Sequence, residues 1–258
     1  MPAKTIDDVS INYLHLGEGT NAQRVIYIHG TGCTGQVFSR HLNVISKDHE
    51  VVALDLPGHG DSTGKGYRGV GDYAFFAAQL VEQLGWPQCV VAGHSLGGGI
   101  ALAVALYFPQ LVKALMMIDS GARLRVAPAT IAASKRLAAG EVKPKALNRL
   151  GFADSTSEEV VRATQALNAN CSADTTYRDW IADDTCDFMS RVAAIEVPTL
   201  AICGREDPLT PLKYHEFMRD NMPNCCLEVI DGAGHWPFVE QPAHFDTAVS
   251  RFLQDLPL

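Results

Sequence analysis

The spacing Gly93-His94-Ser95-Leu96-Gly97 places one serine between two glycines, each two residues away. An apolar run comes directly before this segment, and residues 100–108 after it have the composition of a helix. A strand, a sharp turn and a helix with serine at the turn form the layout of a nucleophile elbow. The turn strains the serine backbone and crowds strand against helix, which explains the two glycines. We therefore predict that the Ser95 hydroxyl stands clear of a sheet as a nucleophile.

A serine hydroxyl is a poor nucleophile, so it needs a general base and an acid that orients the base. Asp207 follows an apolar run at 199–204, and His235 follows another at 225–230. Both would therefore lie on loops past the carboxyl ends of parallel strands, at the sheet edge where Ser95 also lies and where ligands bind in such sheets. The order Ser, Asp, His is one of the known triad orders. Asp119, at the end of the run 115–118, is an alternative acid that we rank below Asp207.

Several segments together resemble proteins of the α/β-hydrolase fold over nearly the whole chain. The matching segments are His29-Gly30-Thr31-Gly32, Asp55-Leu56-Pro57-Gly58-His59-Gly60-Asp61-Ser62, Gly93-His94-Ser95-Leu96-Gly97-Gly98, Val197-Pro198-Thr199, Gly204-Arg205-Glu206-Asp207 and Gly234-His235. The serine at the elbow resembles esterases, lactonases and C–C bond hydrolases, whereas the dehalogenase and epoxide hydrolase branches carry aspartate there.

An oxyanion hole is expected beside the serine, because a tetrahedral intermediate needs N–H donors aimed at its developing charge. One donor is the N–H of Leu96, which follows the nucleophile at the positive end of its helix. The resemblance implies that the second is the N–H of Thr31, with Gly32 as the alternative.

The same loop also matches a competing motif. Residues 30–35 read G-x-G-x-x-G after an apolar run, and Asp55 follows about twenty positions later, as in a dinucleotide-binding fingerprint. This alternative predicts an NAD-dependent oxidoreductase. It gives no role to His29, Ser95, Asp207 or His235, so we favour the hydrolase.

Apolar runs near 24–29, 50–55, 89–94, 112–118, 199–204 and 225–230 alternate with helical segments. This alternation predicts an α/β fold with a mostly parallel, doubly wound sheet, and residues 10–17 are expected to add an antiparallel edge strand. Together with the resemblance it indicates an α/β-hydrolase fold with a core formed by residues 1–120 and 191–258. Residues 121–190, inserted after the sixth strand, are too long for an ordinary connection, and we expect a small helical cap there.

Within this cap we expect helices at 129–139 and after Ser157. Four large side chains in it could line a pocket or simply pack the cap on the core: Phe152, Trp180, Phe188 and Met189. Asp183 and Asp184 are interpreted as a solvated turn or helix cap. Candidates for substrate contact outside the cap are Trp236 and Phe238, beside His235, and Cys33.

Composition narrows the classes of protein further. The chain has 258 residues, 47% of them hydrophobic, and a net charge of −8 without a basic cluster, so nucleic acid is not an expected partner. No apolar run approaches the roughly 20 residues needed to span a membrane, and the first residues lack a signal segment, so we expect a cytoplasmic protein. The seven cysteines lack metal-binding spacing. We therefore expect no metal and no cofactor, and the sequence makes no prediction of the oligomeric state.

These observations predict a serine hydrolase of the carboxylesterase type. It would cleave a small to medium ester through Ser95, His235 and Asp207 by way of an acyl-enzyme. The same triad would also serve a lactonase or enol-lactonase or a C–C bond hydrolase, and an intact triad also occurs in related ligand receptors.

Overall fold

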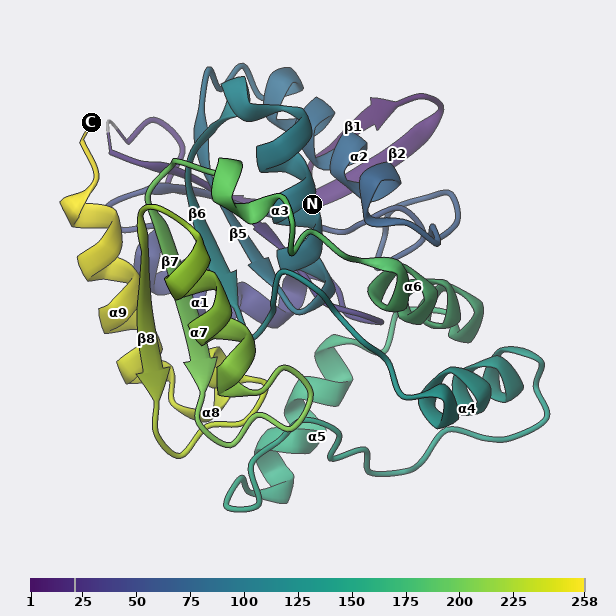
Figure 1. Cartoon of the computed structure of the whole chain (residues 1–258). Coiled ribbons are helices and arrows are strands. Elements are labelled where there is room, and N and C mark those ends of the chain that lie inside the picture. The colour runs from purple at the N-terminus through teal and green to yellow at the C-terminus, as the bar shows by residue number, and fades with distance from the viewer. Residues whose placement is uncertain (21, 258) are drawn as a thin grey trace.

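The computed structural model describes residues 1–20 and 22–257, which form one eight-stranded sheet flanked by helices (Figure 1). The strand order is β1-β2-β4-β3-β5-β6-β7-β8; β2 runs antiparallel to both of its neighbours, β1 and β4, and the six strands from β4 to β8 in this order are parallel to one another. The strands are β1 Ala3–Ile6, β2 Val9–Leu16, β3 Arg24–Ile28, β4 Glu50–Leu54, β5 Cys89–His94, β6 Val112–Ile118, β7 Thr199–Gly204 and β8 Cys225–Ile230.

Helices cover both faces of this sheet. The bounds are η1 Gly35–Phe38, α1 Ser39–Ile45, α2 Val70–Gln83, α3 Leu96–Tyr107, η2 Pro109–Leu111, α4 Pro128–Ala138, α5 Glu158–Leu167, α6 Ala173–Thr185, η3 Val192–Ala194, α7 Leu212–Asn221, α8 Pro237–Glu240 and α9 Pro242–Asp255. Helices α2, α3 and α7 pack on one face, and α1 and α9 pack on the other. The predicted doubly wound α/β fold is therefore confirmed.

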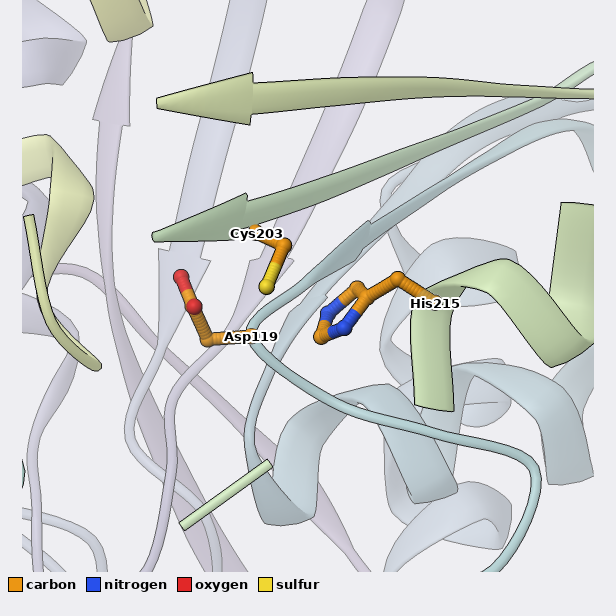
Figure 2. A group of neighbouring side chains, drawn as sticks. All are labelled: Asp119, Cys203 and His215. Carbon is orange, nitrogen blue, oxygen red and sulfur yellow. The ribbon is translucent and has the colours of Figure 1, made fainter. Parts of the chain in front are cut away.

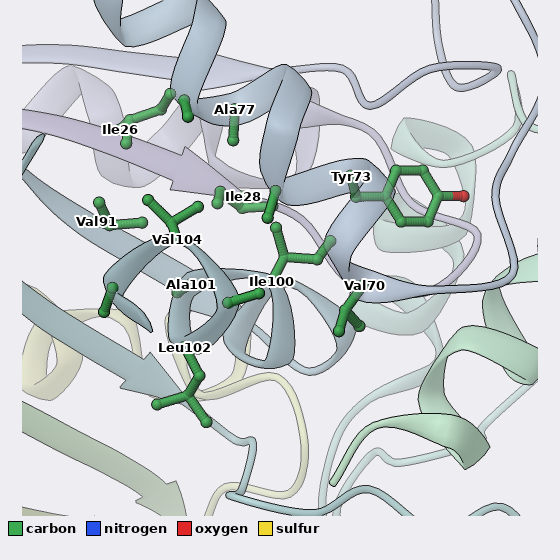
Figure 3. Close-up of a cluster of buried hydrophobic side chains, with 14 of the residues drawn as sticks. Ile26, Ile28, Val70, Tyr73, Ala77, Val91, Ile100, Ala101, Leu102 and Val104 are labelled. Atoms are coloured by element: carbon green, nitrogen blue, oxygen red, sulfur yellow. The ribbon is translucent and has the colours of Figure 1, made fainter. Parts of the chain in front are cut away.

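The central strands are apolar on both sides because both faces are covered. Along β3, Ile26 and Ile28 face α2 and α3, whereas Val25 and Tyr27 face α1 and α9. Figure 3 shows the first of these layers, in which Ile100 and Val104 of α3 lie beside Ile28 of β3. Burying these side chains on both faces fixes the register of the central strands, and with it the positions of the loops at their carboxyl ends.

The amino-terminal edge differs from the prediction. The strand expected at 10–17 is present as β2, but it is an inner strand, because β1 pairs with it antiparallel and forms the edge. The short polar sequence of β1 gives little strand signal, and three of its four residues are not fully buried.

Helices α4, α5 and α6 lie together beyond the arrowhead end of the strands, within the β6–β7 segment, residues 119–198 (Figure 1). The two ends of this segment pair with each other. Leu124 N–H donates to the Cys186 carbonyl at 3.1 Å, and Phe188 N–H donates to the Ala122 carbonyl at 2.7 Å. The expected helix starts are present: Pro128 begins α4, and the Ser157 hydroxyl caps α5 by accepting from Val160 N–H.

Among the residues that the structure describes, no helix has both the length and the apolar composition needed to cross a membrane.

Candidate active site

Ser95 lies at the turn between β5 and α3 with φ +54° and ψ −119°, a conformation that non-glycine residues rarely adopt. A side chain at Gly93 would overlap the carbonyl of Gly97, and one at Gly97 would overlap the carbonyl of Ile28. The strained turn is held by neighbouring groups: Ser95 N–H donates to the Ile118 carbonyl at 3.0 Å, and the Ser120 hydroxyl donates to the Ser95 carbonyl at 2.7 Å. These contacts have the form of a nucleophile elbow.

Asp207, on the loop after β7, meets His235, on the loop after β8. His235 Nδ1–H donates to Asp207 Oδ2 at 2.8 Å, and both residues are buried. Because Nδ1 carries the proton, Nε2 is left as the acceptor that a general base needs.

The Asp207 carboxylate also accepts hydrogen bonds from Leu209 N–H at 2.7 Å and from the Thr210 hydroxyl at 2.5 Å. Burial alone would raise the pKa of Asp207. The opposing effects of His235 and of these donors are stronger together and hold that pKa well below its usual range. The acid therefore stays ionised beside His235.

His235 is positioned from both sides. Its backbone N–H donates to the Gly151 carbonyl of the β6–β7 segment at 2.7 Å, and its carbonyl accepts from His94 Nε2–H at 2.8 Å. The His94 and His235 rings lie 4.8 Å apart. Burial lowers the pKa of His94 to about 3, so the residue next to Ser95 is neutral and adds no charge beside His235.

A cavity of about 170 Å³ opens onto Ser95. Its wall comes from the β6–β7 segment and from the residues that follow Asp207. The lining residues are Leu124, Arg125, Val126, Ala127, Thr130, Leu150, Trp180, Asp183, Pro208, Leu209 and Thr210. Thr210 joins the cavity to the Asp207–His235 pair, since its hydroxyl contacts both. Residues 208–210 directly follow the predicted acid and could have been expected here. Residues 124–127 follow a strand end at the same edge.

The loop after β3 lies against the elbow. A side chain at Gly30 would touch Ser95 Cβ and the His94 ring, so only glycine lets this loop approach so closely. Thr31 and Gly32 follow, Gly32 with φ +64°. Leu96 is the first residue of α3. The two segments predicted to carry the oxyanion donors are therefore neighbours at Ser95.

Asp119, the alternative acid, is fully buried at the end of β6, and its Oδ1 accepts from Gly204 N–H at 2.9 Å. One of its carboxyl oxygens lies within 4.8 Å of Asp207 and His235 side-chain atoms. Burial, together with the negative charge of Asp207, raises the pKa of Asp119 well above its usual range. The hydrogen bond between His235 and Asp207, and the neutral form of Asp119, favour Asp207 as the acid.

Asp119 also belongs to a buried group with Cys203 of β7 and His215 of α7, whose side chains approach one another (Figure 2). Two of these side chains form hydrogen bonds to backbone groups. His215 Nε2 accepts from Ser120 N–H at 3.1 Å, and the Cys203 thiol donates to the Gly204 carbonyl at 3.2 Å. Burial lowers the pKa of His215 to about 4, which keeps this acceptor neutral. The group thus supports the backbone behind the elbow.

The three predicted substrate contacts lie near the site but are not among the described residues that line the cavity. Trp236 stacks on Phe152, with ring centroids 5.4 Å apart, and its Nε1–H donates to the carbonyl of Leu150, which does line the cavity. Phe238 is buried against Phe38 and His94. Cys33 is buried, and its thiol donates to the Thr31 carbonyl at 3.4 Å.

Three of the four large side chains of the β6–β7 segment fit one of the two interpretations, and Met189 fits neither. Trp180 lines the cavity, Phe152 and Phe188 are buried, and Met189 is exposed. The interpretation of Asp183 as part of a solvated turn was wrong: it lies in α6, is 3% exposed and lines the cavity. Its partner is the Thr31 hydroxyl, which lies 152 residues earlier and left no signal in the local sequence.

The carboxylate that suggested a dinucleotide fingerprint accepts hydrogen bonds from two loops of the protein itself. Asp55 Oδ1 accepts from Gly35 N–H at 2.7 Å, and Oδ2 accepts from Asp61 N–H at 3.2 Å. Asp55 therefore ties the loop after β3 to the loop after β4. The geometry favours the hydrolase interpretation of this edge.

Comparison with known proteins agrees with the geometry. Residues 23–242 match the family model of the alpha/beta hydrolase fold. A 3-oxoadipate enol-lactonase of Acinetobacter baylyi is 25% identical, with 97% of this chain and 95% of that protein covered. The solved structure of a thermophilic esterase is 31% identical, with a TM-score of 0.79 and 99% and 97% of the two chains covered. The enol-lactonase structure from Burkholderia xenovorans is 18% identical and has a TM-score of 0.87, with 98% and 100% covered. This protein belongs to the α/β-hydrolase fold family.

Proposed function

We propose that this protein is a serine hydrolase that cleaves small to medium carboxylic esters through Ser95, His235 and Asp207. The observation that carries the proposal is the strained Ser95 in the wall of a cavity, together with a buried histidine whose Nδ1–H is bound to a carboxylate. Such a pair supplies the proton acceptor that makes a serine hydroxyl nucleophilic.

In the first half of the reaction, Ser95 Oγ forms a bond to the carbonyl carbon while His235 Nε2 takes its proton. The carbonyl π electrons move to oxygen, and the N–H groups of Leu96 and Thr31 hold that oxyanion. When the intermediate collapses, the bond to the alcohol oxygen breaks, and His235 gives its proton to the departing alkoxide. Asp207 stabilises the imidazolium in between.

In the second half, water attacks the acyl-enzyme while His235 takes its proton. Collapse of the second intermediate releases the carboxylic acid and returns the proton to Ser95. These residues account for every proton moved.

We further propose that residues 121–190 act as a cap over the remaining core, residues 1–120 and 191–258. Trp180 and Asp183 of α6, and Thr130 of α4, form part of the cavity wall. The cavity, about 170 Å³, is close to the roughly 150 Å³ of a cavity that accommodates benzene, which supports a small acyl or alcohol group. Trp236 would affect substrate binding through Leu150, whose carbonyl it binds, whereas Phe238 and Cys33 pack beside the site.

An enol-lactone or other lactone is the second candidate substrate. It is supported by the enol-lactonase relative, which matches along nearly its whole length, and it requires no change in the triad chemistry. Esters and lactones differ only in whether the alkoxide leaves or stays attached to the acyl group.

The proposal is tested by intact-protein mass after exposure to a fluorophosphonate, followed by assays with acyl esters and lactones. We expect one adduct on the native protein, none on Ser95→Ala, and loss of hydrolysis in that variant. Ser157→Ala, which removes the exposed serine that caps α5, should be labelled like the native protein. Full hydrolysis by Ser95→Ala, or labelling at another residue, would contradict the assignment.

A further inference from the structure

The loop after β3 binds nearly all of its own backbone N–H groups to acceptors within the protein. The N–H groups that donate are those of Gly32, to Asp179 Oδ2 at 2.9 Å; Cys33, to the Gly30 carbonyl at 3.1 Å; Thr34, to Asn168 Oδ1 at 3.3 Å; and Gly35, to Asp55 Oδ1 at 2.7 Å. The N–H of Thr31 has no acceptor among the described residues. The hydrogen bonds therefore leave Thr31, rather than the alternative Gly32, with an N–H available to an oxyanion.

Helix α6 holds the two central residues of this loop. The bond from Cys33 to Gly30 closes a β-turn around Thr31 and Gly32. Asp179 on α6 accepts from Gly32 N–H, and Asp183, one helical turn later, accepts from the Thr31 hydroxyl. Gly32 has φ +64°, and glycine adopts either sign of φ at little cost, so its own backbone does not fix the turn. The contact with α6 supplies that restraint.

Asp179 is itself fixed in place by the core. His59 Nε2–H donates to it at 2.8 Å, and the Tyr73 hydroxyl donates at 2.5 Å. His59 Nδ1–H donates to the Pro57 carbonyl at 3.1 Å, so both ring nitrogens face oxygen acceptors and the ring is an imidazolium. A buried carboxylate paired in this way remains ionised, and an ionised acceptor binds an N–H more strongly than a neutral one. Gly32 N–H is therefore held firmly.

We propose that Asp179 is a positioning residue for the oxyanion hole: by binding Gly32 N–H, it holds Thr31 N–H where the substrate oxyanion forms. The loop already lies against the elbow, since a Cβ at Gly30 would come within 3.0 Å of Ser95 Cβ. A small shift of the turn would therefore move Thr31 relative to Ser95. The proposal rests on the proposed function and gives the cap a second role, because α6 then shapes the catalytic loop as well as covering the cavity.

The kinetic test measures hydrolysis of 4-nitrophenyl butyrate per active site. Asp179→Ala should lower kcat by about 10-fold to 100-fold, because a loosened loop no longer holds the donor in place. KM should change little, because the oxyanion forms only after the substrate has bound. Active sites are counted by complete reaction with a fluorophosphonate, so protein that fails to fold does not lower the measured kcat.

Two further variants separate positioning from stability. Asp179→Asn keeps an oxygen acceptor for Gly32 N–H and should recover most of kcat. Tyr73→Phe removes a hydrogen bond from the same carboxylate but leaves the contact with Gly32, so it should lower stability and keep kcat per active site near the native value.

A purely structural role of Asp179 would reduce the fraction of active sites and leave kcat per active site unchanged. Native kcat in Asp179→Ala would therefore overturn the proposal. An Asn variant no faster than Ala, or a Tyr73→Phe variant as slow as Ala, would also overturn it.

Amide NMR of the native protein tests the same arrangement without any variant. Labelling threonine carbonyls with ¹³C and glycine amides with ¹⁵N selects the resonances of Gly32, Gly35 and Gly64, and the converse labelling selects those of Thr20 and Thr31. Gly32 N–H should be protected from exchange with solvent. Butylboronic acid, which forms a tetrahedral adduct with an activated serine, should shift Thr31 N–H more than Gly32 N–H. An unprotected Gly32, or a larger shift there, would overturn the proposal even if Asp179→Ala does not fold.

The failure of this proposal is distinguishable from the failure of the proposed function. A native Ser95 that does not react with the fluorophosphonate would refute the hydrolase chemistry, and with it any catalytic role of the loop. A native Ser95 that reacts, together with native kcat per active site in Asp179→Ala, would refute only the role of Asp179.

Discussion

The change Asp179→Ala should cause a large loss of stability, although the residue is not part of the proposed triad. It removes the shared acceptor of His59, Tyr73 and Gly32, and Asp179 and His59 are both fully buried. Breaking a buried ion pair by removing one partner costs about 3–5 kcal/mol, because the other charge remains buried.

Two further donors, the Tyr73 hydroxyl and Gly32 N–H, would lose their acceptor at about 1–3 kcal/mol each if they stayed dry. Water entering the space left by the carboxylate offsets part of this cost, so we expect about 4 kcal/mol in total. At roughly 2–4 °C per kcal/mol, the midpoint of thermal unfolding should fall by about 10 °C.

Urea and thermal unfolding, followed by circular dichroism, measure this effect. Asp174→Ala provides the control, because Asp174 pairs with Arg178 on the exposed side of the same helix and should change stability by less than about 1 kcal/mol. A loss below 1 kcal/mol in Asp179→Ala would refute the argument that this ion pair anchors α6.

The pH dependence gives a second check on the same pair. Burial alone would lower the pKa of His59, but the charge and hydrogen bond of Asp179 raise it well above 6.5. A histidine whose pKa is raised on folding stabilises the native state below its unfolded pKa, and the contribution fades as pH rises through the folded value. We therefore expect the stability advantage of the native protein over Asp179→Ala to shrink at alkaline pH. An advantage that grows with pH would contradict the charge assignment.

Three other outcomes follow from the site. Asp207→Asn should lower kcat for ester hydrolysis by about four orders of magnitude, because an amide cannot hold the imidazole in the required tautomer. The pKa of Asp207 is lower in the folded than in the unfolded protein, so its contribution to stability is present above the usual aspartate pKa and is lost as pH falls below about 4. The free energies of unfolding of the native and Asp207→Asn proteins should therefore converge at acid pH. Gly97→Ala would push a methyl group into the Ile28 carbonyl and should cost at least about 2 kcal/mol in urea unfolding, whereas Gly71→Ala, with open space in α2, should be neutral or stabilising.

Strands β3 to β8 could be predicted to within about one residue. Strands β3 to β7 are parallel strands whose two faces are covered, and such strands are rich in apolar residues. Strand β8 is mostly apolar in sequence although it forms an edge and is only partly buried. Strand β1 could not be predicted from an apolar run, because it lies at the edge of the sheet and the polar residues Lys4 and Thr5 occupy positions that are not buried. The candidate triad could be predicted for a related reason: Ser95 directly follows β5, and Asp207 and His235 lie three and five residues past the ends of β7 and β8.

The cavity wall was less predictable, because it depends on the path of the β6–β7 segment across the sheet edge. Neither Leu150 nor Trp180 follows a strand, and their places are set by contacts to distant loops. The sequence around Asp183 is as polar as that of a surface helix, and only the approach of Thr31 shows why an acid is buried there.

The contacts of α6 also bear on how substrate reaches Ser95. Moving α6 would break the buried Asp179–His59 pair and the hydrogen bonds to Thr31 and Gly32. Displacing this helix from the core would therefore cost several kcal/mol. Helix α4 packs on α6 and buries only Ser134 among its own residues. A helix with so little buried surface is displaced at lower cost. Thr130, the part of the cavity wall on α4, is therefore expected to move at lower cost than α6, whereas Leu124 and Val126 are held by hydrogen bonds to Cys186 and Asp184.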